Sequence, residues 1–183
     1  MKQLCLLPIA YCLLVVFPSC KQRTDYSKEL SRLDSTLIVA TATDSMLQHT
    51  DTAKVGSIIR ETELKLEMIS EKIKSDTVNK RSALLLSGCY EANSQLRNLI
   101  INKEFFTKAF TESKTRIENL KHDLKESSIE QNKALEYVVH ELNASGKVTD
   151  LAMGMHKEMT GAILKLDSLK EQLTALEDSL QSK

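Results

Sequence analysis

The chain has 183 residues, with 25 basic and 25 acidic side chains, so its formal net charge is zero. The two signs are mixed along the whole length, and there is no basic stripe of the kind that nucleic-acid binding requires. Both prolines, Pro8 and Pro18, lie in the first twenty residues, and the chain has only five glycines. A sheet protein needs turn residues every few positions. This composition therefore excludes a β-sheet fold and predicts an all-α fold.

The first twenty residues differ from the rest of the chain. Met1-Lys2 is a short basic start, and an apolar run follows from Leu4 to Phe17, interrupted by Pro8. The run is too short for a membrane-spanning helix, which needs about 20 apolar residues. A basic start, a short apolar run and a small residue before the cut are typical of a secretory signal, so residues 1–19 are predicted to be a signal peptide.

The tetrad Phe17-Pro18-Ser19-Cys20 that closes the run resembles the lipobox of bacterial lipoproteins, where the signal is cut before a cysteine that carries diacylglycerol. Ser19 and Cys20 fit that pattern, whereas Phe17 stands where leucine is commonest and Pro18 is unusual. The resemblance implies that Cys20 is the lipidated first residue of the mature protein. Its covalent diacylglycerol and acyl chain would be the only cofactor, and membrane lipid its partner. An ordinary cleaved signal and a retained anchor are the alternatives.

The resemblance also implies a place in the bacterial cell envelope. Lys21 follows the cysteine, where some lipoproteins retained at the inner membrane have aspartate, so the outer membrane is favoured. The sequence leaves open whether the protein faces the periplasm or the surface. Residues 20–26 are predicted to be the lipidated cysteine and a short polar tether. Lys21 to Tyr26 spans at most about 20 Å, which keeps the folded part close to the bilayer.

Residues 27–183 are predicted to form the helical domain, beginning with a segment from about Ser27 to Ser75. Its apolar seam follows alternating steps of three and four residues, which indicates an amphipathic helix. Between Leu47 and Val55 the step is eight, and this stretch is rich in Thr, Asp and Gly. A kink or a break near Asp51 is therefore an alternative to one continuous helix.

The second segment, from about Thr77 to Lys125, has the cleanest periodicity, and Lys103 and Ser113 are its polar interruptions. Sustained heptads of this kind indicate coiled-coil-like packing between helices. Cys89 lies on the apolar stripe, and it is the only cysteine that remains once the signal is removed and Cys20 carries lipid. It is therefore predicted to be buried, without an intramolecular disulfide.

The third segment is predicted to begin at a capping box, Ser127-Ser128-Ile129-Glu130. Its first apolar patch comprises Leu135, Val138, Val139 and Leu142, and a regular leucine seam from Leu166 to Leu180 closes the chain. Asn143 to Gly146 between them is weak in helix formers and could end or kink the helix.

Helices with a single apolar stripe must pack together to bury it. Short polar connections at Ser75-Asp76-Thr77 and Glu126-Ser127 make neighbouring helices antiparallel. The sequence therefore predicts an elongated antiparallel bundle of three long helices. A break near Asp51 or Gly146 would give four or five helices instead.

One local cluster has the residue types of a metal site. Met153, Met155, His156 and Met159 supply thioether and imidazole ligands, which suit Cu(I). Met155 and Met159 lie one helical turn apart, and His156 is three residues from Met159. The alternative is that the methionines are adaptable core residues, with His156 at the edge of the stripe.

No catalytic residue is nominated, because no phosphate loop, nucleophile elbow or dinucleotide fingerprint is present. His140-Glu141 begins like a zinc-protease motif, but Ala144 stands where the second histidine is needed. The function expected is a non-enzymatic interaction, spacer or adaptor module, with a protein partner or self-association through its helical surfaces. The alternative is an extracytoplasmic protein that binds or senses a soft metal, Cu(I) or Ag(I), through the Met/His cluster.

Overall fold

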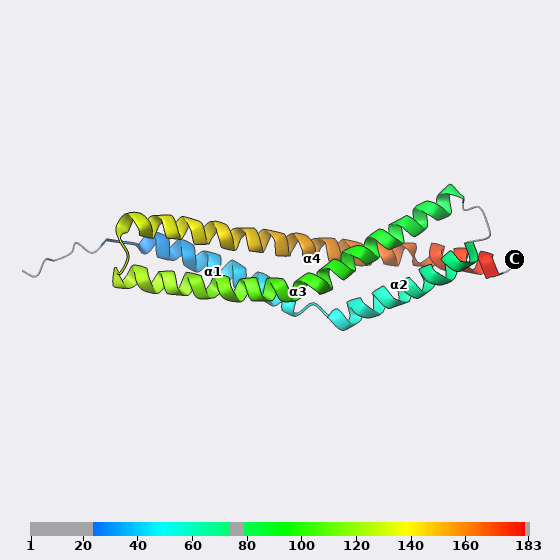
Figure 1. Cartoon of the computed structure of the whole chain (residues 1–183), viewed down its shortest axis with the longest axis horizontal. Helices are drawn as coiled ribbons and strands as arrows, with labels where there is room; N and C mark the ends of the chain where they lie inside the picture. The colour runs from blue at the N-terminus through cyan, green and yellow to red at the C-terminus, as the bar shows by residue number, and fades with distance from the viewer. Residues whose placement is uncertain (1–23, 74–78, 182–183) are drawn as a thin grey trace, which may run out of the picture.

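The computed structural model describes residues 24–73 and 79–181, which form four α-helices and no strand (Figure 1). In chain order the helices are α1 (Ser27–Gln48), α2 (Thr52–Ile73), α3 (Lys80–Glu126) and α4 (Gln131–Gln181). The predicted all-α fold is confirmed. The predicted signal peptide at 1–19, Cys20 and the connection at Ser75–Thr77 lie outside the described residues.

The four helices pack into one elongated bundle. α3 and α4 extend along the long axis of the molecule, and α1 and α2 cover successive parts of them (Figure 1). α1 packs against α3 and α4, α2 packs against the same two helices, and α1 makes no packing contact with α2. α3 runs opposite to the other helices (Figure 1). The first predicted segment is therefore two helices, and the bundle has four helices rather than three.

The alternative of a break near Asp51 is the one that the structure has, and its cause is visible. Asp51 Oδ1 accepts a hydrogen bond from the backbone N–H of Lys54 at 2.9 Å. This bond caps the first turn of α2, where amide groups lack partners inside the helix. At the end of α1, Lys103 Nζ donates to the carbonyl oxygens of Gln48 and Thr50, at 3.3 and 3.1 Å. Lys103, a polar residue within the apolar seam of α3, thus binds the backbone where α1 ends and the chain turns into α2.

The alternative of a further break near Gly146 is wrong, because α4 continues through this residue from Gln131 to Gln181. Ser145 and Thr149 are buried on either side of it. Contacts with α1 and α3 therefore hold the helix through a stretch of weak helix formers, as tertiary packing commonly does.

The predicted capping box is also wrong. Ser127 adopts the left-handed conformation, with φ of 53°, and its backbone N–H donates to the carbonyl oxygen of Leu124 at 3.3 Å. The backbone N–H of Ser128 donates to the carbonyl oxygen of Asp123 at 3.1 Å. Ser127 thus ends α3, where the last carbonyl groups need donors, and α4 begins only at Gln131.

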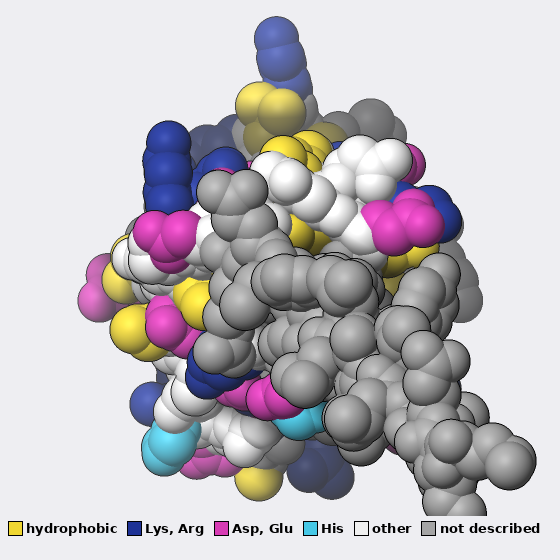
Figure 2. All heavy atoms as spheres, turned by 90° about the vertical axis from the view of Figure 1, so that its left-hand side faces the viewer, with side chains coloured by type: hydrophobic (Ala, Val, Ile, Leu, Met, Phe, Trp, Pro, Cys, Tyr) yellow, Lys and Arg dark blue, Asp and Glu magenta, His cyan; other side chains and the backbone are white. Residues whose placement is uncertain are grey.

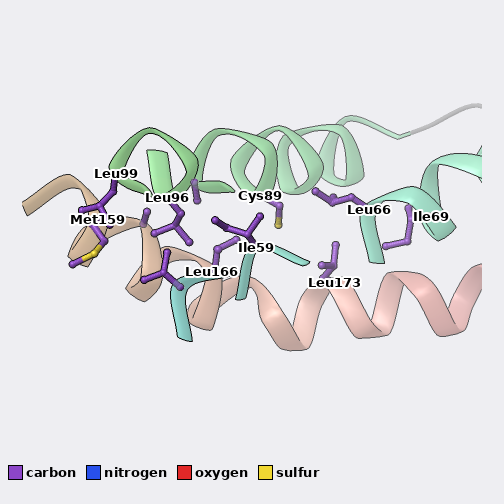
Figure 3. Close-up of a cluster of buried hydrophobic side chains, with 12 residues drawn as sticks. Ile59, Leu66, Ile69, Cys89, Leu96, Leu99, Met159, Leu166 and Leu173 are labelled. Atoms are coloured by element: carbon purple, nitrogen blue, oxygen red, sulfur yellow. The ribbon is translucent and has the colours of Figure 1, made fainter. Parts of the chain in front are cut away.

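Buried apolar side chains fill the bundle along its length. The largest cluster joins α2, α3 and α4, and its side chains point toward one another between the three ribbons (Figure 3). The residues labelled there are Ile59, Leu66, Ile69, Cys89, Leu96, Leu99, Met159, Leu166 and Leu173. The predicted burial of Cys89 is confirmed, since this residue is 1% exposed. A second cluster surrounds Leu33 and Leu124, and a third surrounds Phe110.

The first apolar patch predicted on α4 is only half correct. Val138 is buried and Leu142 partly buried, whereas Leu135 and Val139 are 43% and 50% exposed. The buried side of α4 in this stretch instead carries Ala134 together with Val138. Leu135 and Val139, each one residue further along, therefore lie on the outside of the bundle.

Candidate functional site

The described chain starts at one end of the bundle (Figure 1). The described chain begins at Thr24, four residues after Cys20, close to the turn between α3 and α4 (Figure 1). Asp25 Oδ1 accepts a hydrogen bond from the backbone N–H of Ser27 at 2.9 Å, which lowers the pKa of Asp25. Tyr26, predicted to be part of the polar tether, is 6% exposed and packs in the second cluster. The bundle therefore begins at Tyr26.

Charges of both signs surround this end. In Figure 2, which views the molecule from this side, basic and acidic side chains are interspersed rather than gathered by sign. Lys121 Nζ lies 2.7 Å from Asp34 Oδ1 of α1 and 3.1 Å from Glu118 Oε2. Hydrogen bonds to Asp34 and then to Glu118 raise the pKa of Lys121. This ion-pair network joins α1 to α3 near the start of the bundle.

The four helices do not have the composition of membrane spans. Within residues 24–73 and 79–181, none is both long enough and apolar enough to cross a bilayer. Their apolar side chains lie instead in stripes between polar ones, and most of the stripes face neighbouring helices.

The structure separates the members of the Met/His cluster. Met153 is 52% exposed, whereas Met159 is 6% exposed and belongs to the largest apolar cluster. Met155 is partly buried against that cluster, and His156 is partly buried, with an Nδ1 atom that has no hydrogen-bond partner. No group of three or more His, Cys, Asp and Glu side chains in the described part of the chain could hold a metal ion.

A small cavity of about 80 Å³ lies beside Cys89, between α2, α3 and α4. Its wall includes Glu61, whose Oε1 lies 3.3 Å from Lys170 Nζ, and also Thr62 and Lys65. Burial raises the pKa of the Cys89 thiol. Because the thiolate is the reactive form of cysteine, a thiol held protonated is a poor nucleophile. The cavity therefore offers a packed thiol rather than a reactive one.

The most buried charge in the bundle was not anticipated from the sequence. Asp44 of α1 is 4% exposed, and Lys114 Nζ of α3 lies 2.5 Å from its Oδ2 atom. Gln48 Nε2 donates to the other carboxylate oxygen at 3.1 Å. The sequence does contain an indication of this buried charge, because Asp44 occupies a position of the apolar seam, four residues after Ala40 and three before Leu47. A charge inside an apolar seam indicates a partner on the facing helix.

A second polar contact and two buried hydroxyl groups lie in the same half of the bundle. Arg116 Nε donates to Glu141 Oε2 at 3.0 Å and thereby joins α3 to α4. Ser113 and Ser145 are fully buried, and neither Oγ atom has a hydrogen-bond partner in the structure. Arg116 and Glu141 also line a surface pocket, together with Tyr137 and His140.

Comparisons with protein-family models, curated protein sequences and solved structures found no match. The class that the described residues define is an all-α bundle of four packed helices.

Proposed function

We propose that this protein is a lipoprotein of the bacterial cell envelope, anchored through Cys20, that acts as a non-enzymatic interaction, spacer or adaptor module. The lipobox-like tetrad Phe17-Pro18-Ser19-Cys20 is the observation that carries the anchor. The proposal includes removal of residues 1–19, diacylglycerol and an acyl chain on Cys20, and an outer-membrane address favoured by Lys21. Its partners are membrane lipid and another helical surface.

The position of the chain start supports a spacer or adaptor. The bundle begins four to six residues after Cys20, at one end of an elongated molecule (Figure 1). α3, with 47 residues, is about 70 Å long at 1.5 Å per residue. An anchor at one end of such a bundle would let it either extend from the bilayer or lie along it. Both arrangements offer long helical surfaces to a partner.

We also propose that the four helices act mechanically as one antiparallel three-helix rod, in which α1 and α2 together take the place of one long helix. α1 and α2 share the partners α3 and α4 and are joined end to end by three residues. The bonds from Lys103 to Gln48 and Thr50 restrain that joint. Coiled-coil-like packing along α3 and α4 would then carry a load from one end of the rod to the other.

The anchor is tested by replacing Cys20. The Cys20→Ser variant is expected to lose metabolic palmitate labelling and to move from the membrane fraction to the soluble fraction. Cys89→Ser is the matched control, because Cys89 is the other cysteine beyond the predicted signal and is buried in the bundle. This control should keep both the label and the membrane fraction. Palmitate labelling or membrane retention that persists in Cys20→Ser would contradict the proposal.

A second candidate function, binding or sensing of Cu(I) or Ag(I), is favoured by one observation: the buried Nδ1 atom of His156 has no partner. Met155 and Met159 lie on the same helix within one turn of it. Under this hypothesis, titration with Ag(I) should give a dissociation constant tighter than micromolar, and His156→Ala should weaken it about tenfold or more. Met153→Leu is the control, since Met153 is exposed. Weaker binding by the unmodified chain would end the metal hypothesis.

A further inference from the structure

The side of α4 that faces away from the core forms a second, outward seam. Its members follow alternating steps of four and three residues, as the buried seams do, and they lie on one face of the helix. All are exposed except the half-buried first residue. We call this set the outer face: Gly146, Asp150, Met153, Lys157, Thr160 and Leu164, flanked by Gly154 and Gly161.

Packing inside the bundle does not account for the glycines of the outer face. A Cβ atom added at Gly146, Gly154 or Gly161 would meet nothing within 4 Å. Each glycine inside a helix costs about 1 kcal/mol relative to alanine. Beside them, Met153 and Leu164 are 52% and 65% exposed. Gaps between exposed apolar side chains are what a closely packed external helix would fill.

The two charges of the outer face determine which helix fits. Asp150 lies three residues before Met153, and Lys157 lies three residues after Gly154. Neither charge forms an ion pair within the described part of the chain. A two-fold axis between Met153 and Gly154 would set each Asp150 opposite Lys157 of a second copy. In a parallel pair, like charges would face each other, which disfavours that orientation.

The same two-fold axis also matches the sizes of the side chains. It sets Met153 above the gap at Gly154 of the second copy, and Gly146 opposite Gly161. We propose that the outer face of α4 binds the outer face of a second copy of this chain in an antiparallel dimer.

This dimer deepens the proposed function, on which it rests for its setting, by naming the partner as another copy of the chain. Since the two bundles run in opposite directions, their tethered ends lie at opposite ends of the pair. Both Cys20 anchors can then reach one bilayer only if the pair lies along its surface. Upright bundles could instead pair only between two membranes.

Self-association is measured on the chain from Lys21 onward, which includes every described contact and carries no lipid. Sedimentation velocity should detect a dimer, and Gly154→Leu should raise its dissociation constant about tenfold or more. The melting temperature of the Gly154→Leu monomer should not fall, because leucine favours helix and the added Cβ meets nothing. Gly56→Leu on α2 is the matched control, since its Cβ is equally free, and it should leave the dimer intact.

Disulfide cross-linking tests the orientation, in chains that also carry Cys89→Ala. A mixture of Asp150→Cys and Lys157→Cys chains should form a cross-linked heterodimer under mild oxidation, whereas Asp150→Cys alone should not form a homodimer. The reverse pattern, a monomer at micromolar concentrations, or a dimer that Gly154→Leu leaves unchanged would overturn the proposal. A failure of the Cys20 anchor would leave all these results intact, because the chains used here are not lipidated.

Discussion

Phe110→Ala is expected to lower the free energy of unfolding by about 3–5 kcal/mol, a large share of the roughly 5–15 kcal/mol that stabilises an ordinary domain. Phe110 is 0% exposed and lies in a cluster that includes Ala40 and Ala152. Those small neighbours cannot extend into the space that the ring would leave, whereas Met46 and Met155, which pack on the same cluster, can fill part of it. The cavity should therefore persist in part, which keeps the loss within this range.

Phe105→Ala is the matched control for this prediction. Phe105 is 63% exposed, and its ring packs edge-to-face on Phe106 with 5.5 Å between the centroids. Loss of this contact should lower the stability by less than about 1 kcal/mol. Urea denaturation followed by circular dichroism measures both variants. Equal losses would mean that Phe110 does not occupy the centre of the bundle.

The regular parts of the fold could be predicted because they depend on local periodicity. In α3, residues from Cys89 to Leu124 at four-three spacing are buried as expected, interrupted by Lys103. The sequence offered a break near Asp51 only as an alternative to one continuous helix, because the three-four spacing of the seam is lost there; in the structure Asp51 caps the new helix. In both places, residues close together in the sequence decide the structure.

The features that the sequence did not predict depend on which helices meet. Ser127 and Glu130 have the spacing of a capping box, but the carbonyl groups at the end of α3 bind the backbone N–H groups of the turn instead. Leu135 and Val139 of the predicted patch are exposed, whereas Val138 of the same patch faces α1 and α3 together with Ala134, which the patch did not include. A run of neighbouring apolar residues does not reveal which of them the partners will cover.

The candidate sites divide in the same way. The lipobox-like tetrad is a local pattern and can be read directly from the sequence. The contact between Asp44 and Lys114 joins residues 70 positions apart, so only the packing of α1 on α3 brings them together. The Met/His cluster looks compact as a string of residues, but successive residues of a helix point about 100° apart, and Met153 and Met159 are placed on different sides.

The buried ion pair yields the second large effect. Lys114→Met should lower the free energy of unfolding by about 2–3 kcal/mol, because it leaves Asp44, 4% exposed, without a counter-charge. The loss should be below the largest values for buried pairs, since the Lys114 side chain is 28% exposed and its solvation already screens the interaction. Lys108→Met, in a pair with Glu112 whose side chains are 79% and 56% exposed, should change the stability little.

The double variant Asp44→Leu with Lys114→Met separates the attraction between the charges from the penalty of leaving one charge alone. When both charges are removed, apolar side chains can fill the space between α1 and α3, and no buried group lacks its partner. Replacements of this kind are often neutral or stabilising, so the double variant should recover to within about 1 kcal/mol of the original chain. A double variant as unstable as Lys114→Met alone would mean that the pair does not sit in the packed interface. Recovery would show that Asp44 and Lys114 contribute specificity to the packing of α1 on α3 more than they contribute stability.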